Sequence, residues 1–165
     1  DAQETELAWL MASESKDHPV CILLTRQNLP VYEKADPDWK NTIRCGAYVA
    51  YNCEGDADVT VLATGSEVSM AIEAANMVSD KNIRVVSIVD FNKFDDMEKA
   101  EQDALIGGAK RVVCAEAGIS ANWKAYATSK ADLFCIDRFG ESGPANKVAE
   151  HLGFTASKLA EELKK

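Results

Sequence analysis

Four short apolar runs alternate with helix-like patterns over the C-terminal two thirds of the chain. They are VTVLA (59–63), VVSIV (85–89), VVCA (112–115) and LFCI (133–136). Strands that are apolar on both faces and separated by helices are typical of parallel sheets whose two faces are both covered. The alternation therefore predicts an α/β fold, in which residues 57–165 form a three-layer domain on a mostly parallel sheet of about five strands.

The clearest helix is expected directly after the first of these runs. Its apolar side chains recur at helical spacing, and they are Val68, Ala71, Ile72, Ala75 and Val78. At its start, Thr64 and Glu67 have the spacing of a capping box. Free amides at a helix start can also bind an anion, but the segment lacks the glycines of a dinucleotide site and the lysine of a P-loop. We interpret it as a structural cap.

The N-terminal end of the chain is organised differently. Asp1 and Glu4 have the spacing of a capping box ahead of a helix, and the apolar run Val20–Thr25 predicts a strand. One helix and one strand cannot close a hydrophobic core. Residues 1–25 are therefore expected to be a helix–strand remnant that packs against another part of the protein, and the start without a methionine suggests a fragment.

Residues 26–56 form a connection in which prolines and glycines are spread among polar residues. A short strand is expected within it, at Ala47–Tyr51. A stretch of this length with little regular structure suits a linker between domains better than a loop within one domain. The sequence therefore predicts a linker between the N-terminal remnant and the domain at 57–165.

Composition narrows the classes of function. The chain has 165 residues, of which 47% are hydrophobic and 27% charged, a balance typical of soluble globular proteins. Its 18 basic and 27 acidic residues give a net charge of −9, which disfavours nucleic acid as a partner, and no apolar run is long enough to span a membrane. The cysteines form no Cys-x-x-Cys pair, so we expect reduced thiols and a cytoplasmic location. They are Cys21, Cys45, Cys53, Cys114 and Cys135.

Polar residues follow several predicted strands, where α/β proteins often place ligand contacts. In CILLTRQNLPVY an apolar run leads into Thr25 and Arg26, although polar residues are also the usual exit of a strand. Glu116 follows a later strand and has no visible acid–base partner. Asp137 and Arg138 follow another, where an ion pair that holds the turn is the alternative to a ligand contact.

Four separate blocks, in order and in register, resemble the C-terminal part of transketolase, and together they cover nearly the whole chain. The blocks are TRQNLP (25–30), ATGSEVSMAIEAA (63–75), EAG followed by Trp123 (116–123) and IDRFGESGPANKVAEHLGFT (136–155). The resemblance implies that residues 1–25 are the tail of the family's pyrimidine-binding domain, 26–56 the linker and 57–165 its third, C-terminal domain.

The resemblance also implies a function. The family transfers a two-carbon ketol unit between sugar phosphates in the pentose phosphate pathway, as a homodimer that uses thiamine diphosphate and a divalent metal (Mg or Ca). By this likeness Arg26 binds the phosphate of the sugar substrate, with Thr25 beside it. No catalytic, cofactor-binding or metal-binding residue is implied in this chain, because the family's Gly-Asp-Gly motif and its activating glutamate are missing. We therefore expect the chain alone to be inactive and free of cofactor, and the third domain to support dimerisation or regulation.

Two other interpretations stay open at this point. Deoxyxylulose-phosphate synthase and the beta subunits of 2-oxo acid dehydrogenases share this third domain, although the RQNLP and IDRFG blocks favour transketolase. The second interpretation is a free-standing interaction or regulatory module without catalysis.

Overall fold

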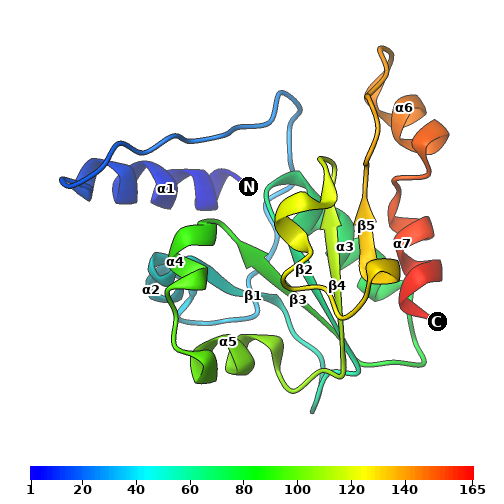
Figure 1. Cartoon of the computed structure of the whole chain (residues 1–165), viewed down its shortest axis with the longest axis horizontal. Helices are drawn as coiled ribbons and strands as arrows, with labels where there is room; N and C mark the ends of the chain where they lie inside the picture. The colour runs from blue at the N-terminus through cyan, green and yellow to red at the C-terminus, as the bar shows by residue number, and fades with distance from the viewer.

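A computed structural model describes all 165 residues of the chain. Helix α1 (Ala2–Glu14) and the extended segment after it lie at one end of the molecule, and the C-terminal helices lie at the other (Figure 1). The β-sheet lies between them. None of the helices combines the length and the apolar character that crossing a membrane requires.

The domain is built on one five-stranded sheet with the strand order β1-β3-β2-β4-β5. Strand β2 pairs in parallel with both β3 and β4, β5 pairs in parallel with β4, and β1 runs antiparallel to β3. The predicted α/β fold with a mostly parallel sheet is therefore confirmed. The strands are β1 (Ala47–Tyr51), β2 (Val59–Ala63), β3 (Ile83–Ile88), β4 (Arg111–Glu116) and β5 (Leu133–Cys135).

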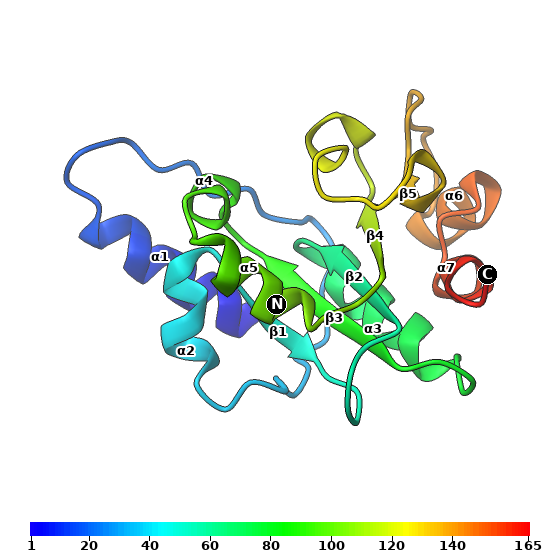
Figure 2. The ribbon, with the colours of Figure 1, turned by 60° about the horizontal axis from the view of Figure 1, so that its bottom comes forward.

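Helices cover both faces of this sheet, which makes three layers (Figure 2). Helices α3 (Ser66–Asn76) and α7 (Ala156–Leu163) contribute buried side chains to the larger core cluster. Helices α4 (Phe91–Asp95) and α5 (Lys99–Ile106) contribute to the second cluster, on the opposite face. The remaining elements are α2 (Trp39–Thr42), α6 (Ala145–Leu152) and the short 3-10 turns η1 (Ile43–Cys45), η2 (Ser120–Trp123) and η3 (Lys130–Asp132).

Strand β2 shows why the parallel strands read as continuous apolar runs. All five of its residues are buried. Val61 joins the larger core cluster and its neighbour Leu62 joins the second one, because successive side chains of a strand point to opposite faces. A strand covered on both faces has no solvent side on which polar residues would alternate.

The strand predicted at Val20–Thr25 is wrong. These residues form an extended coil, and Leu23 within it is 91% exposed. A strand needs a neighbour to satisfy its backbone N–H and C=O groups, and none of the five strands of the sheet pairs with this run. The short strand at Ala47–Tyr51 is confirmed as β1, and it lies at an edge of the sheet although the sequence placed it within the connecting stretch.

One of the two predicted capping boxes is present. At α1 the Asp1 carboxylate accepts hydrogen bonds from the backbone N–H groups of Gln3 and Glu4, both at 3.0 Å. At α3 the predicted cap is wrong, because the N-cap residue is Gly65 and no side chain caps the helix. Gly65 has a φ of +54°, a conformation that favours glycine, and the turn therefore moves Thr64 out of the capping position.

Candidate functional site

Acidic side chains from three segments gather at the carboxyl end of the parallel strands. Glu116 is the last residue of β4, where the sequence predicted a polar group. Its Oε1 accepts a hydrogen bond from the backbone N–H of Gly118 at 2.9 Å, and its Oε2 accepts one from the indole N–H of Trp123 at 3.3 Å. Trp123 is buried. Glu116 therefore fastens the loop that follows β4, and both of its oxygens are bonded within the chain.

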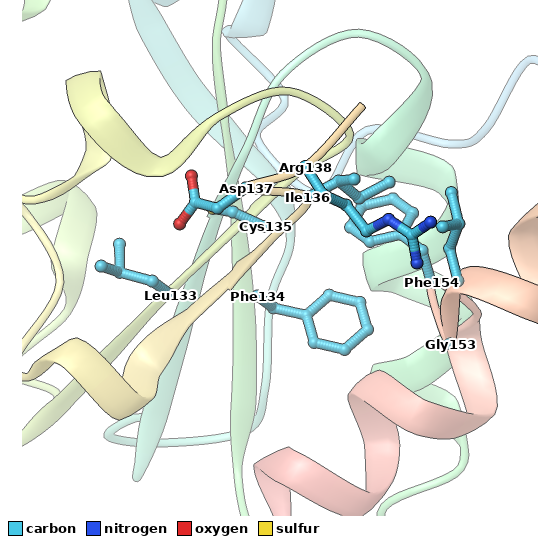
Figure 3. A pocket seen from close by; sticks show the side chains of 9 residues that line it. Leu133, Phe134, Cys135, Ile136, Asp137, Arg138, Gly153 and Phe154 are labelled. Atoms are coloured by element: carbon cyan, nitrogen blue, oxygen red, sulfur yellow. The ribbon is translucent and has the colours of Figure 1, made fainter. Parts of the chain in front are cut away.

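Asp137 and Arg138 follow β5, and their side chains point in different directions (Figure 3). The Asp137 carboxylate accepts hydrogen bonds from the backbone N–H and the hydroxyl of Ser120, both at 2.8 Å, and these bonds hold the pKa of Asp137 below its usual range. Arg138 donates to Glu141 at 2.8 Å. An ion pair does hold the turn, but it joins Arg138 to Glu141, while Asp137 bonds to the loop after β4.

Glu67 is the third acidic group, and the sequence suggested only a capping role for it. It lies in the first turn of α3, is buried, and accepts a hydrogen bond from the Ser66 hydroxyl at 2.7 Å. The pKa of Glu67 is raised from 4.5 to about 6, because burial and, to a smaller extent, the charge of Glu116 together outweigh the hydrogen bond from Ser66 that lowers it. Two carboxylates, Glu67 on α3 and Glu116 on β4, therefore interact at this edge of the sheet.

These acidic groups do not form a metal site. No group of three His, Cys, Asp or Glu side chains in the chain is placed to hold a metal ion. Carboxylates prefer to ligate hard cations when several converge on one point, and here Glu67, Glu116 and Asp137 each accept bonds from neighbouring loop or helix residues instead. The arrangement supports a structural role, in which Glu116 and Asp137 fasten the loop after β4 and Glu67 bonds within the first turn of α3.

A cavity of about 330 Å³ opens beside β5 (Figure 3). Six of its nine lining residues are hydrophobic, and the Phe134 and Phe154 rings in its wall stack with centroids 5.0 Å apart. Its only basic residue is Arg138, whose guanidinium is paired with Glu141. The cavity therefore does not offer a free cation to a phosphate group.

Thr25 and Arg26 belong to the extended segment that connects α1 with the domain. Figure 1 shows this segment, which is distant in sequence from the residues at the end of the sheet. Arg26 is exposed, and its guanidinium forms no ion pair within the chain. The Thr25 hydroxyl donates to the carbonyl of Gln27 at 3.2 Å, which makes a local turn. No hydrogen bond or ion pair joins these two residues to the acidic groups at the end of the sheet.

A buried hydrogen-bond network, which the sequence did not predict, joins α1 to the sheet. The Glu4 carboxylate accepts hydrogen bonds from the Tyr48 hydroxyl on β1 at 2.9 Å and the Ser87 hydroxyl on β3 at 2.6 Å. The Tyr48 and Tyr32 hydroxyls lie 2.7 Å apart. Burial, followed by the charge of Glu4, raises the pKa of both tyrosines, so both hydroxyls stay protonated. Glu4 and Ser87 are 83 positions apart, a separation that leaves no local signal in the sequence.

Comparison with known proteins identifies the class to which this fold belongs. The model of the family described as the transketolase-like TK C-terminal domain matches residues 46–155. The chain therefore belongs to the transketolase-like C-terminal domain family, and the resemblance found in the sequence is confirmed.

The similar proteins themselves are transketolases. A transketolase of Treponema pallidum (strain Nichols) is 45% identical over 162 residues, which is 98% of this chain and 24% of that protein. The solved transketolase from Leishmania mexicana superposes with a TM-score of 0.86 at 30% identity, over 98% of this chain and 23% of its own. A transketolase from Pichia stipitis in complex with sedoheptulose-7-phosphate has the same TM-score, identity and coverage. The chain thus spans about a quarter of the length of these relatives.

Proposed function

We propose that the chain is the C-terminal part of a transketolase, which transfers a two-carbon ketol unit between sugar phosphates in the pentose phosphate pathway. The similarity to transketolases over almost its whole length supports this assignment, and one of those relatives was solved with a sugar phosphate. The whole enzyme would be a cytoplasmic homodimer. Within it, the chain would supply one residue that binds the substrate phosphate and a domain that supports dimerisation or regulation.

The observation that carries this proposal is the exposed Arg26 with no ion-pair partner in the chain. A guanidinium is always charged, and its planar array of donors matches two oxygens of a phosphate. The other arginines of the domain are engaged, as Arg111 is with Asp132 at 2.6 Å and Arg138 is with Glu141. We assign Arg26 as the phosphate-binding residue, with Thr25 next to it in the substrate site.

We propose a domain organisation that accompanies this assignment. Residues 1–25 would be the tail of the pyrimidine-binding domain, 26–56 the linker and 57–165 the C-terminal domain. The N-terminal segment exposes large apolar side chains, with Trp9 at 61% and Leu24 at 58%. Clusters of exposed apolar residues mark surfaces that another part of a protein covers, and the remaining three quarters of the relatives' length would supply that cover.

Thiamine diphosphate and a divalent metal (Mg or Ca) would be held by the rest of the enzyme. The residues present do not fit this group, because no three side chains are placed to hold a metal, and Gly55-Asp56 lacks the second glycine of the family's motif. We therefore derive no chemical step through the cofactor within this chain. The chain alone is expected to be inactive and to bind no cofactor.

The proposal is tested by Arg26→Ala in the full-length enzyme, with ribose-5-phosphate and plain ribose compared as acceptors. A phosphate contact is made in the ground state and the transition state alike, so its loss raises KM for the phosphorylated acceptor more than it changes kcat. Hydrogen bonds to charged groups contribute about 1.5–3 kcal/mol, so the expected rise is roughly ten- to a hundredfold. Arg26→Lys should recover only part of the loss, because it keeps the charge without the planar donors.

Arg138→Ala is the matched control, since Arg138 is also exposed but is paired with Glu141. It should leave both KM values unchanged. Equal losses with both acceptors in Arg26→Ala would show that Arg26 is a structural residue. Ketol transfer by this chain alone would contradict the expected inactivity, and activity that returns only when the N-terminal portion is added would support it.

A further inference from the structure

We propose that Tyr48 is a positioning residue for substrate binding, because it holds in place one end of the loop that carries Arg26. This inference rests on the proposed role of Arg26. We call residues 25–31 the Arg26 loop. The loop is largely exposed and has one hydrogen bond within it, from Thr25 to Gln27, so its position depends on how its ends are fixed. The residue that directly follows its C-terminal end is Tyr32, whose hydroxyl contacts the Tyr48 hydroxyl.

The hydrogen bonds that fix Tyr32 have a defined direction. A tyrosine hydroxyl has one hydrogen to donate, and a carboxylate can only accept. The Tyr48 hydroxyl donates its hydrogen to Glu4 at 2.9 Å, so the Tyr32 hydroxyl, 2.7 Å away, must donate to Tyr48. The order is therefore Tyr32 to Tyr48 to Glu4. Removing the middle hydroxyl leaves Tyr32 without an acceptor and Glu4 without one of its donors.

The backbone of Tyr32 is held at the same place. Its N–H donates to the Asp1 carboxylate at 3.3 Å, and its carbonyl accepts from the Lys34 ammonium at 3.0 Å. The Lys34 ammonium also lies 4.3 Å from the centroid of the Tyr32 ring and pairs with Asp1. Tyr32 is thus fixed by side chain and backbone to the first turn of α1 and to the sheet.

Tyr48 is the member of this network that joins Tyr32 to the sheet. It is 0% exposed, lies in β1, and its ring packs against Trp39 with centroids 5.5 Å apart. A side chain binds its ligand more tightly when neighbouring residues already hold it in the bound geometry before the ligand arrives. Loss of the Tyr48 hydroxyl should therefore loosen the Arg26 loop without disturbing the sheet, and only substrates that Arg26 contacts should be affected.

The test is Tyr48→Phe in the full-length enzyme, with ribose-5-phosphate and plain ribose as acceptors. Net hydrogen-bond contributions predict a rise of about two- to tenfold in KM for ribose-5-phosphate, with kcat and the KM for ribose unchanged. Tyr51→Phe is the matched control, because Tyr51 lies on the same strand and its hydroxyl donates to Asn76 at 3.1 Å, outside the network. It should change neither KM.

A double variant separates positioning from general stability. In an Arg26→Ala background, Tyr48→Phe should cause no further rise in KM, because the group it positions is gone. An additional rise there, or an equal rise for both acceptors, would overturn the inference. If Arg26→Ala itself does not distinguish the acceptors, the proposed role of Arg26 fails first. If Tyr48→Phe does not fold, Tyr32→Phe removes the first donor of the network instead. It must give the same selective rise in KM for ribose-5-phosphate, and its absence would equally overturn the inference.

Discussion

The pH dependence of stability tests whether burial disfavours the charge of Glu67 at the end of the sheet. Its pKa rises from 4.5 in the unfolded chain to about 6 in the folded one, mainly because it is buried. The folded state therefore binds more protons than the unfolded state between these values, so the contribution of Glu67 to stability is lost as the pH rises through this window. The difference between a pKa of 4.5 and one of about 6 corresponds to roughly 2 kcal/mol of stability.

The variant Glu67→Gln removes the charge and keeps an acceptor oxygen for the Ser66 hydroxyl. We expect its stability relative to the unsubstituted chain to increase by about 2 kcal/mol between pH 4 and pH 7.5. Urea unfolding followed by tryptophan fluorescence, at intervals of half a pH unit, measures this difference. Any loss of packing or hydrogen bonding in the variant is the same at every pH, so only the charge contributes to the change.

Glu73→Gln is the control, because Glu73 is exposed on the same helix. Its difference from the unsubstituted chain should stay flat over the same range. A flat difference for Glu67→Gln would show that the buried environment does not disfavour its charge. A difference that moves in the opposite direction would mean that the hydrogen bond from Ser66 outweighs burial.

Two further predictions concern the stability of the chain and its thiols. Gly46→Ala should destabilise the chain by about 2–5 kcal/mol in urea unfolding, because an added Cβ would combine a positive φ with contacts at 2.7 Å to two backbone atoms. Gly55→Ala, also at positive φ but in open space, should cost only about 1–2 kcal/mol, and equal losses would refute the steric argument. Burial raises the pKa of Cys114 and raises that of Cys135 to about 11, so a thiol reagent should label exposed Cys21 in the native state and these two only after unfolding. Rapid native labelling of either would contradict this.

The parallel strands could be predicted because burial on both faces leaves a strong signal in the sequence. Every residue of β2 is buried, and so are four of the six residues of β4. The run Val20–Thr25 has the same apolar character and is nevertheless a coil. Apolar composition indicates that a segment favours burial, but a strand also requires a neighbouring strand with which to pair. The sequence of the segment itself does not show whether such a neighbour is present.

Residues of the candidate site could be predicted only where their position at the end of an apolar run indicated a role. Glu116 was located at the end of β4 because it follows an apolar run, and the role of Arg26 stays a prediction. Glu4 and Glu67 suggested helix caps, since spacing reveals only partners within a few residues. Glu4 does belong to a capping box, but it also accepts a hydrogen bond from Ser87. Burial of a carboxylate between distant elements depends on the completed fold, and no local pattern shows it.

The contact between Glu4 and Ser87 also sets an order of events during synthesis. The two residues are 83 positions apart, so at 5–20 residues per second Glu4 is made about 4–17 s before its partner. Helix α1 can form early, because its capping box is local, but it cannot dock until β1 and β3 have paired. Helix α1 is therefore made before the two strands that hold it, and it is attached only after Tyr48 on β1 and Ser87 on β3 are in place.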